Sequence, residues 1–228
     1  PGVISRGYGG QSTHWPVRVN ADSDAILIGD EPLLIAQQTH CPVAVGPVRV
    51  ESARLLLEND ELDVIISDDG LQHYALYRDI EIVVIDGVRR FGNNFCLPSG
   101  PLRETQARIQ EVDFVICNGG KPEESEILMQ LEGSHALNMQ TNERRSLAEF
   151  KGGNCHALAG IGNPQSFFDL LAQQGISCQT HPFPDHYVYS SKDIGFKSAD
   201  AIFMTEKDAV KCRSFATAQH WYVPVQAN

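Results

Sequence analysis

Leu62-Asp63-Val64-Ile65-Ile66-Ser67-Asp68-Asp69-Gly70-Leu71-Gln72-His73 is the stretch that decides the fold. Its first five residues form an apolar run with β-branched Val and Ile, which is typical of a strand buried on both faces of a parallel sheet. The following Ser, Asp, Asp and Gly are turn residues, so we expect the strand to end there. Ligands of open α/β sheets bind beyond the carboxyl ends of the strands. The end of this strand is therefore the first candidate site.

Asp68 and Asp69 are the candidate metal ligands at this strand end. Hard cations such as Mg²⁺ prefer carboxylate oxygens, and paired aspartates can hold the ion directly or through water. A turn that caps the next helix is the alternative explanation of an Asp-Asp-Gly sequence. The continuation into Gln72 and His73 favours a functional site.

The neighbouring segments alternate between strand and helix patterns. Apolar runs predict strands at residues 41–45, 62–66, 80–87 and 114–118, and a helix lies between the first two, at 50–59. A doubly wound, mostly parallel sheet is the simplest assembly of this β-α-β order. The fold class is therefore α/β.

The polar stretch at 142–154 interrupts this order and predicts a linker. A second β-α series follows it, with strands at 155–159, 201–204 and 221–225 and helices that begin after Asn163 and Thr205. We therefore expect a first domain at 1–141 and a smaller α/β domain at 155–228.

Composition limits the classes of function. The net charge of −11 disfavours a general binder of nucleic-acid phosphates. The six cysteines have no Cys-x-x-Cys spacing, so neither a zinc site nor a disulfide scaffold is indicated. No apolar run approaches the roughly 18 residues of a membrane span. The sequence starts with Pro1-Gly2-Val3-Ile4-Ser5, which lacks an initiator Met and is typical of the end of a strand, and this suggests a natural N-terminus further upstream.

Several loops carry further candidate residues. Asp30 follows an apolar run and precedes a helix pattern, so it is either an N-cap or a reactive acid. The long loop at 88–104 contains arginines that suit a phosphate, although solvated charges explain Arg89 and Arg90 equally well and Arg103 less well. His186 lies beside Asp185 in a proline-stiffened loop, where an isolated histidine is usually solvated.

Seven segments together resemble the tetraacyldisaccharide 4'-kinases of lipid A and lipopolysaccharide biosynthesis. Each is modest alone, but their order is highly specific: Ser5-Arg6-Gly7-Tyr8-Gly9-Gly10, Gly29-Asp30-Glu31-Pro32, Asp68-Asp69-Gly70-Leu71-Gln72-His73, Gly100-Pro101-Leu102-Arg103-Glu104, Gly160-Ile161-Gly162-Asn163-Pro164, Phe183-Pro184-Asp185-His186-Tyr187 and Met204-Thr205-Glu206-Lys207-Asp208-Ala209. The resemblance implies a P-loop kinase fold. It also implies an enzyme that transfers the γ-phosphate of ATP, with Mg²⁺, to the 4'-hydroxyl of a tetraacyldisaccharide 1-phosphate at the cytoplasmic face of the inner membrane.

The resemblance also implies roles for individual residues. Asp30 would take the proton of the sugar hydroxyl, and His186 would pair with it across two domains, so that closure of a cleft assembles the site. Asp68 and Asp69 resemble Walker B acids that hold Mg²⁺, with Glu31 as a further candidate ligand. Arg103 would neutralise charge on the transferring phosphoryl group. The disaccharide would contact Arg6 and Tyr8, and the metal or substrate would be supported by Gln72 and His73.

The sequence departs from the family pattern at its start. In the family a Walker A loop and an N-terminal hydrophobic segment for membrane attachment precede Ser5-Arg6-Gly7, and this sequence begins after both. Because the Walker A loop cradles the ATP phosphates, we expect these 228 residues alone to be a soluble fragment that phosphorylates nothing.

Two alternatives belong to other classes of function. Asp68, Asp69, His73 and Asp86 are ligand types that also suit a metal-dependent phosphohydrolase. The other alternative is a non-catalytic remnant that binds lipid or nucleotide.

Overall fold

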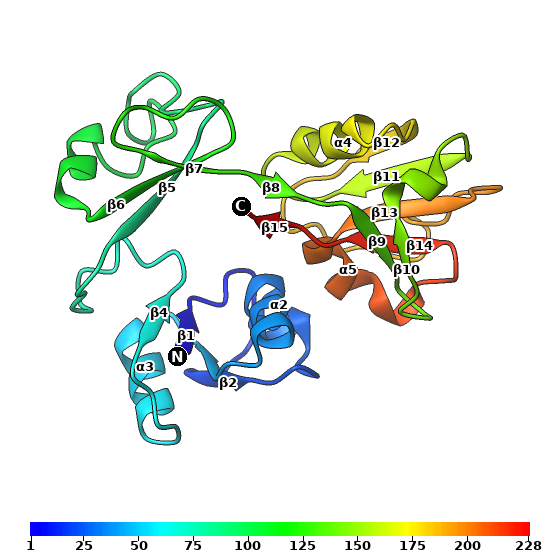
Figure 1. Ribbon diagram of the computed structural model, residues 1–228. Helices are drawn as coiled ribbons and strands as arrows, with labels where there is room; N and C mark the ends of the chain where they lie inside the picture. The colour runs from blue at the N-terminus through cyan, green and yellow to red at the C-terminus, as the bar shows by residue number, and fades with distance from the viewer. The chain divides into compact units, whose positions relative to one another are not determined.

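The computed structural model describes residues 1–228, and Figure 1 labels its elements. The chain divides into two compact units. The larger unit contains Pro1–Gly70 and Gly133–Pro224, and the smaller unit contains Leu71–Glu132 and Val225–Asn228. Asp30 and His186, which are far apart in the sequence, therefore belong to the same unit.

The first sheet of the larger unit has the strand order β2-β3-β1-β4. β1 pairs in parallel with β3 and β4, and β2 pairs antiparallel with β3. Its strands and connecting helices are β1 (Gly2–Ser5), β2 (Val17–Val19), α1 (Ala25–Ile28), α2 (Asp30–Thr39), β3 (Val43–Val45), α3 (Arg49–Leu57) and β4 (Ile65–Ser67). Buried valines of this sheet pack against Leu33 and Ala36 of α2, which fixes that helix on the sheet.

The strand expected at residues 62–66 is shorter and more exposed than its apolar sequence predicts. β4 begins only at Ile65, and the side chains of Val64 and Ile66 are 55% and 53% exposed. β4 is an edge strand with β1 as its neighbour in the sheet. The prediction of a strand buried on both faces is therefore wrong, although the predicted parallel pairing is confirmed.

The second sheet of the larger unit has the order β10-β9-β14-β13-β11-β12, and its last four strands in that order run parallel. The elements of this part are β9 (His135–Asn138), β10 (Arg144–Ser146), η2 (Leu147–Phe150), β11 (Cys155–Ala159), α4 (Pro164–Gln173), β12 (Cys178–Pro182), β13 (Ala201–Thr205), α5 (Glu206–Cys212), η3 (Arg213–Phe215) and β14 (His220–Val223). Figure 1 shows α4 and α5 on opposite faces of this sheet. Successive strand residues explain this arrangement, because Ala157 packs with α4 and Leu158 packs with α5.

The smaller unit contains a parallel sheet with the order β5-β6-β7. Its elements are β5 (Ile82–Asp86), η1 (Gln106–Glu111), β6 (Phe114–Asn118) and β7 (Ile127–Met129), together with the antiparallel pair β8 (Leu131–Glu132) and β15 (Gln226–Ala227). Ile85, Val115 and Cys117 are buried, whereas Ile82, Val84 and Phe114 are exposed. One face of this sheet is therefore open within the unit.

The compact units do not follow the boundary predicted at residues 142–154. That stretch contains β10 and η2, and β10 pairs with β9 in the second sheet. Its polar side chains suit an edge strand, since Arg144, Arg145 and Ser146 are all exposed. Independent folding of the two predicted domains stays a prediction.

Candidate functional site

Asp30 lies at the first position of α2, one residue later than the predicted N-cap. Gly29 is the N-cap, with φ 95° and ψ 153°, a conformation that glycine adopts without steric cost. The Asp30 side chain is buried, and its Oδ1 accepts a hydrogen bond from the Glu31 amide at 3.0 Å. The positive end of the helix dipole favours a carboxylate at this position.

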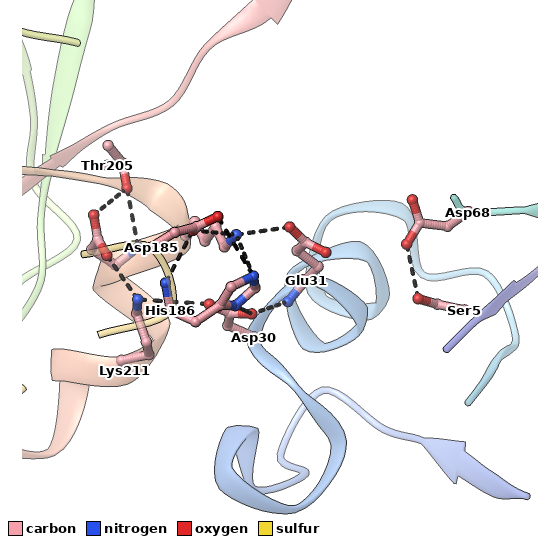
Figure 2. Close-up of polar contacts among 10 residues, drawn as sticks. Ser5, Asp30, Glu31, Asp68, Asp185, His186, Thr205 and Lys211 are labelled. Carbon is pink, nitrogen blue, oxygen red and sulfur yellow. Dashed lines mark hydrogen bonds and ion pairs between the residues drawn. The ribbon is translucent and has the colours of Figure 1, made fainter. Parts of the chain in front are cut away.

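His186 approaches Asp30 from the loop that follows β12, as Figure 2 shows. Its Nδ1 lies 3.2 Å from Asp30 Oδ1, and its ring centroid lies 4.9 Å from that of Tyr8. His186 has φ 57°, an uncommon value for a residue with a Cβ. The structure thus brings three of the predicted site residues together within one unit.

Two lysines of α5 face the first turn of α2. Lys207 Nζ lies 2.8 Å from Glu31 Oε1, 3.3 Å from Asp185 Oδ1 and 3.5 Å from His186 Nε2. Burial acts to lower the pKa of Lys207, but its hydrogen bond to Glu31 and the nearby carboxylates outweigh this effect and raise the pKa. Glu31, a candidate metal ligand, is therefore held by an ammonium group here.

Lys211 lies one helical turn after Lys207 and contacts Asp30 itself. Its Nζ is 3.6 Å from Asp30 Oδ2 and 2.8 Å from Asp208 Oδ1. Neither lysine was assigned a role from the sequence. Their spacing of four residues, which places side chains on one helix face, was the available signal.

Asp208 contacts Lys211 from within the core of the unit. It is fully buried, and its Oδ2 accepts hydrogen bonds from the Gly160 amide at 2.9 Å and the Thr205 hydroxyl at 2.7 Å. The Thr205 hydroxyl also accepts from the Asp208 amide, which confirms the predicted cap of α5. The buried Tyr189 ring lies beneath Lys211, with Nζ 5.1 Å from the ring centroid.

Asp68 lies at the carboxyl end of β4, apart from the group around Asp30 (Figure 2). Its Oδ2 accepts a hydrogen bond from the Ser5 hydroxyl at 2.8 Å, and its carbonyl oxygen accepts one from buried Arg49. The carboxylate and carbonyl oxygens of Asp68 are the type of ligand that suits Mg²⁺. The neighbouring Asp69 has φ 45°. The structure contains no group of three or more His, Cys, Asp or Glu side chains that is placed to hold a metal ion. This holds for the ligands expected of the kinase and for those expected of the phosphohydrolase.

The smaller unit holds two further predicted residues, Gln72 and Arg103, in one hydrogen-bonded group. Gln72 donates to Glu104 at 2.7 Å and accepts from Arg103 at 3.3 Å. Tyr74 also donates to Glu104, and the hydrogen bonds from Tyr74 and, second, from Gln72 lower the pKa of Glu104. Tyr74, Arg103 and Glu104 line a cavity of about 750 Å³.

His73 follows Gln72 in the same turn region of the smaller unit and is half-buried. Arg6, in the loop after β1 of the larger unit, is exposed.

None of the helices has both the length and the apolar character needed to cross a bilayer.

Comparison with known proteins identifies the family. Residues 1–228 match the family described as LpxK: Tetraacyldisaccharide-1-P 4'-kinase. The tetraacyldisaccharide 4'-kinase of Nitrosococcus oceani is 49% identical over 228 residues, which cover 100% of this chain and 67% of that protein. The protein of the same name from Photobacterium profundum is 52% identical over 232 residues, covering 100% of this chain and 66% of its own.

A solved structure supports the same assignment. The "apo" form of LpxK from Aquifex aeolicus, crystallised in complex with ATP, superimposes with a TM-score of 0.78 at 26% identity. The match covers 100% of this chain and 74% of that one. The α/β class of a P-loop kinase and the resemblance drawn from seven short segments are thereby confirmed, and the chain belongs to the tetraacyldisaccharide-1-P 4'-kinase family.

Proposed function

We propose that the full-length protein transfers the γ-phosphate of ATP to the 4'-hydroxyl of a tetraacyldisaccharide 1-phosphate in lipid A biosynthesis, at the cytoplasmic face of the inner membrane. Family membership supplies the reaction. The observation that carries the proposal is the contact between Asp30 and His186 at 3.2 Å, because a sugar hydroxyl needs a base to become an effective nucleophile.

Asp30 is the base in this proposal. Its carboxylate accepts the hydroxyl proton while the hydroxyl oxygen bonds to phosphorus and ADP leaves. His186 Nε2 faces the Lys207 ammonium at 3.5 Å, and an ammonium group only donates hydrogen bonds. Nε2 is therefore the acceptor nitrogen, the proton is on Nδ1, and the imidazole donates to Asp30. Asp185 Oδ2 favours the other tautomer, with the proton on Nε2, but it lies farther from Nε2, at 3.8 Å, than the Lys207 ammonium, so its effect is weaker.

Asp68 and Asp69 would hold Mg²⁺, whose charge would balance that of the ATP phosphates. The Ser5 hydroxyl supports this role, because it fixes the Asp68 carboxylate at the end of two parallel strands. Glu31 would join the metal only by leaving Lys207.

The remaining residues keep their predicted roles as part of the proposal. Arg103 would neutralise charge on the phosphoryl group, with Gln72 and His73 in support. Arg6 and Tyr8 would contact the disaccharide. The position of Tyr8 against the His186 ring supports this role, since a sugar at Asp30 would meet the same tyrosine.

The test measures phosphate transfer from ATP to the lipid acceptor by the full-length protein. Asp30→Asn and His186→Gln should each lower turnover by about 10²-fold to 10⁴-fold, the range of a positioned acid or base. Asp22→Asn is the matched control, because Asp22 is an exposed acid in the loop before α1. Wild-type turnover in Asp30→Asn would overturn the role of Asp30. A wild-type protein that leaves the 4'-hydroxyl unmodified would overturn the function.

A further inference from the structure

Lys211 connects the proposed base to a buried carboxylate that the reaction itself does not use. We propose that Lys211 is a positioning residue for Asp30, and that Asp208 holds Lys211 in place for this purpose. The inference rests on the proposed function only for the role of Asp30. Its geometric content, that Lys211 orients the Asp30 carboxylate toward His186, stands on the structure.

The hydrogen bonds of Asp30 are divided unequally between its two oxygens. Oδ1 faces the Glu31 amide at 3.0 Å and His186 Nδ1 at 3.2 Å, which together occupy its two lone pairs. Oδ2 is buried and accepts no hydrogen bond from the chain. A buried acceptor without a hydrogen bond requires an explanation. Oδ2 is therefore the oxygen that remains able to accept a proton.

Lys211 balances the charge of this oxygen without occupying it. The separation of 3.6 Å is that of an ion pair, longer than a hydrogen bond, so the lone pairs of Oδ2 stay available. The side chains of Lys211, Asp30 and Asp208 are only 12%, 6% and 0% exposed. Without the ammonium group, two buried carboxylates would face each other, and the Asp30 side chain would turn away from its place beside His186.

The position of Lys211 is itself fixed by the surrounding structure. Asp208 Oδ1 holds the ammonium at 2.8 Å, while the other oxygen of Asp208 is bound by Gly160 and Thr205. The aromatic ring of Tyr189 lies beneath the same cation. A flexible surface lysine has no such partners. Lys211, by contrast, holds its ammonium group at a fixed position beside Asp30 Oδ2.

The experiment combines kinetics and nitrogen NMR on the full-length protein. Lys211→Met should lower kcat by about 10-fold to 100-fold, the effect of a displaced reacting group, while the KM values change little. It should also move the ¹⁵N resonance of His186 Nδ1 away from its wild-type position, toward that of Asp30→Asn. Lys197→Met is the matched control, because Lys197 is an exposed lysine of the same unit.

A second variant covers the case in which Lys211→Met fails to fold. Asp208→Asn keeps an acceptor for the Gly160 amide but turns an NH₂ group toward Lys211, so it should change kcat and the Nδ1 resonance in the same directions. In the Asp30→Asn background, Lys211→Met should cause no further loss of turnover, because Lys211 acts through Asp30.

The possible failures are distinguishable. An unchanged Nδ1 resonance in both Lys211→Met and Asp208→Asn would overturn the inference, as would a full additional loss of kcat in the Asp30→Asn background. A wild-type protein without transfer activity would overturn the proposed function. The NMR comparison would then still decide whether Lys211 orients Asp30.

Discussion

Gly29 sets the direction in which the chain enters α2 and therefore where Asp30 points. Its φ of 95° is strained for any residue with a Cβ, and a Cβ at this position would lie 2.8 Å from the Tyr8 carbonyl oxygen. We expect Gly29→Ala to lower the free energy of unfolding by about 1–3 kcal/mol, the cost of a sparsely populated backbone conformation. It should also lower turnover, because Asp30 and Tyr8 are displaced. Urea-induced unfolding and the transfer assay measure the two effects.

Gly152→Ala separates backbone strain from the steric contact. Gly152 has a φ of 81°, but no atom lies within 4 Å of the Cβ position. This variant should therefore carry only the conformational cost and leave turnover unchanged. An equal loss of stability in the two variants would show that the contact with Tyr8 contributes nothing.

We expect Lys207 to determine which nitrogen of His186 carries the proton. Its ammonium at 3.5 Å favours Nε2 as an acceptor, whereas Asp185 Oδ2 at 3.8 Å favours an Nε2–H donor. Lys207→Met should therefore populate the Nε2–H tautomer, weaken the contact with Asp30 and lower turnover. The ¹⁵N shifts of the two ring nitrogens report the tautomer directly. Adding Asp185→Asn should reverse part of the change, and an unaltered Nδ1–H form in Lys207→Met would contradict the prediction.

At the scale of elements, an ion pair joins the segment after β5 to the segment before β7. Arg90 Nη2 lies 2.6 Å from Glu126 Oε1. The hydrogen bond from Arg90, followed by the Glu123 amide, lowers the pKa of Glu126 from 4.5 to about 2. Because the folded pKa lies below the ordinary value, the stabilisation is complete above pH 4.5 and is lost as the pH falls toward 2.

Glu126→Gln should remove this pH dependence. We expect wild-type stability to decrease between pH 5 and pH 2 and the variant to lose less over about the same range, as measured by urea-induced unfolding. Glu123→Gln is the control, since Glu123 is the more exposed partner of the same arginine. Parallel pH profiles for wild type and Glu126→Gln would exclude the Arg90 pair as the cause.

Individual elements show how far the sequence predicts this fold. β6 and β11 have the predicted residues, because each is a mostly apolar run with buried side chains. The run at 62–66 has the same pattern but forms a partly exposed edge strand, and apolar periodicity cannot distinguish an edge from a centre. β10 was not predicted because its sequence is polar, and an edge strand does not need apolar side chains.

The site was predictable to a different extent. The resemblance predicted that Asp30 and His186 pair, and the structure places them in contact. The spacing of Lys207 and Lys211 places them on one face of α5 but does not show what that face contacts. A lysine in the last turn of a capped helix, such as Lys211, is common on solvated surfaces. Only the packing of α5 on α2 turns both lysines toward carboxylates.

At the scale of the whole molecule, the two compact units differ in how completely their sheets are covered. Every residue of β11 and β13 in the larger unit is buried, with helices packed on both faces of their sheet. In the smaller unit, β5 alternates between exposed and covered residues, and Ile82 and Val84 are exposed on one face. Amide hydrogens exchange through local opening, which is easiest where few apolar contacts are lost.

We therefore expect amide exchange in β5–β7 to be at least about tenfold faster than in β11 and β13, since local stability follows buried apolar contact. Hydrogen exchange followed by mass spectrometry measures both sheets in one experiment. Glu126→Gln should accelerate exchange in β5–β7 alone, because Arg90 and Glu126 both belong to the smaller unit. Equal protection of the two sheets, or acceleration of β11 and β13 by this variant, would mean that the units open together as one cooperative structure.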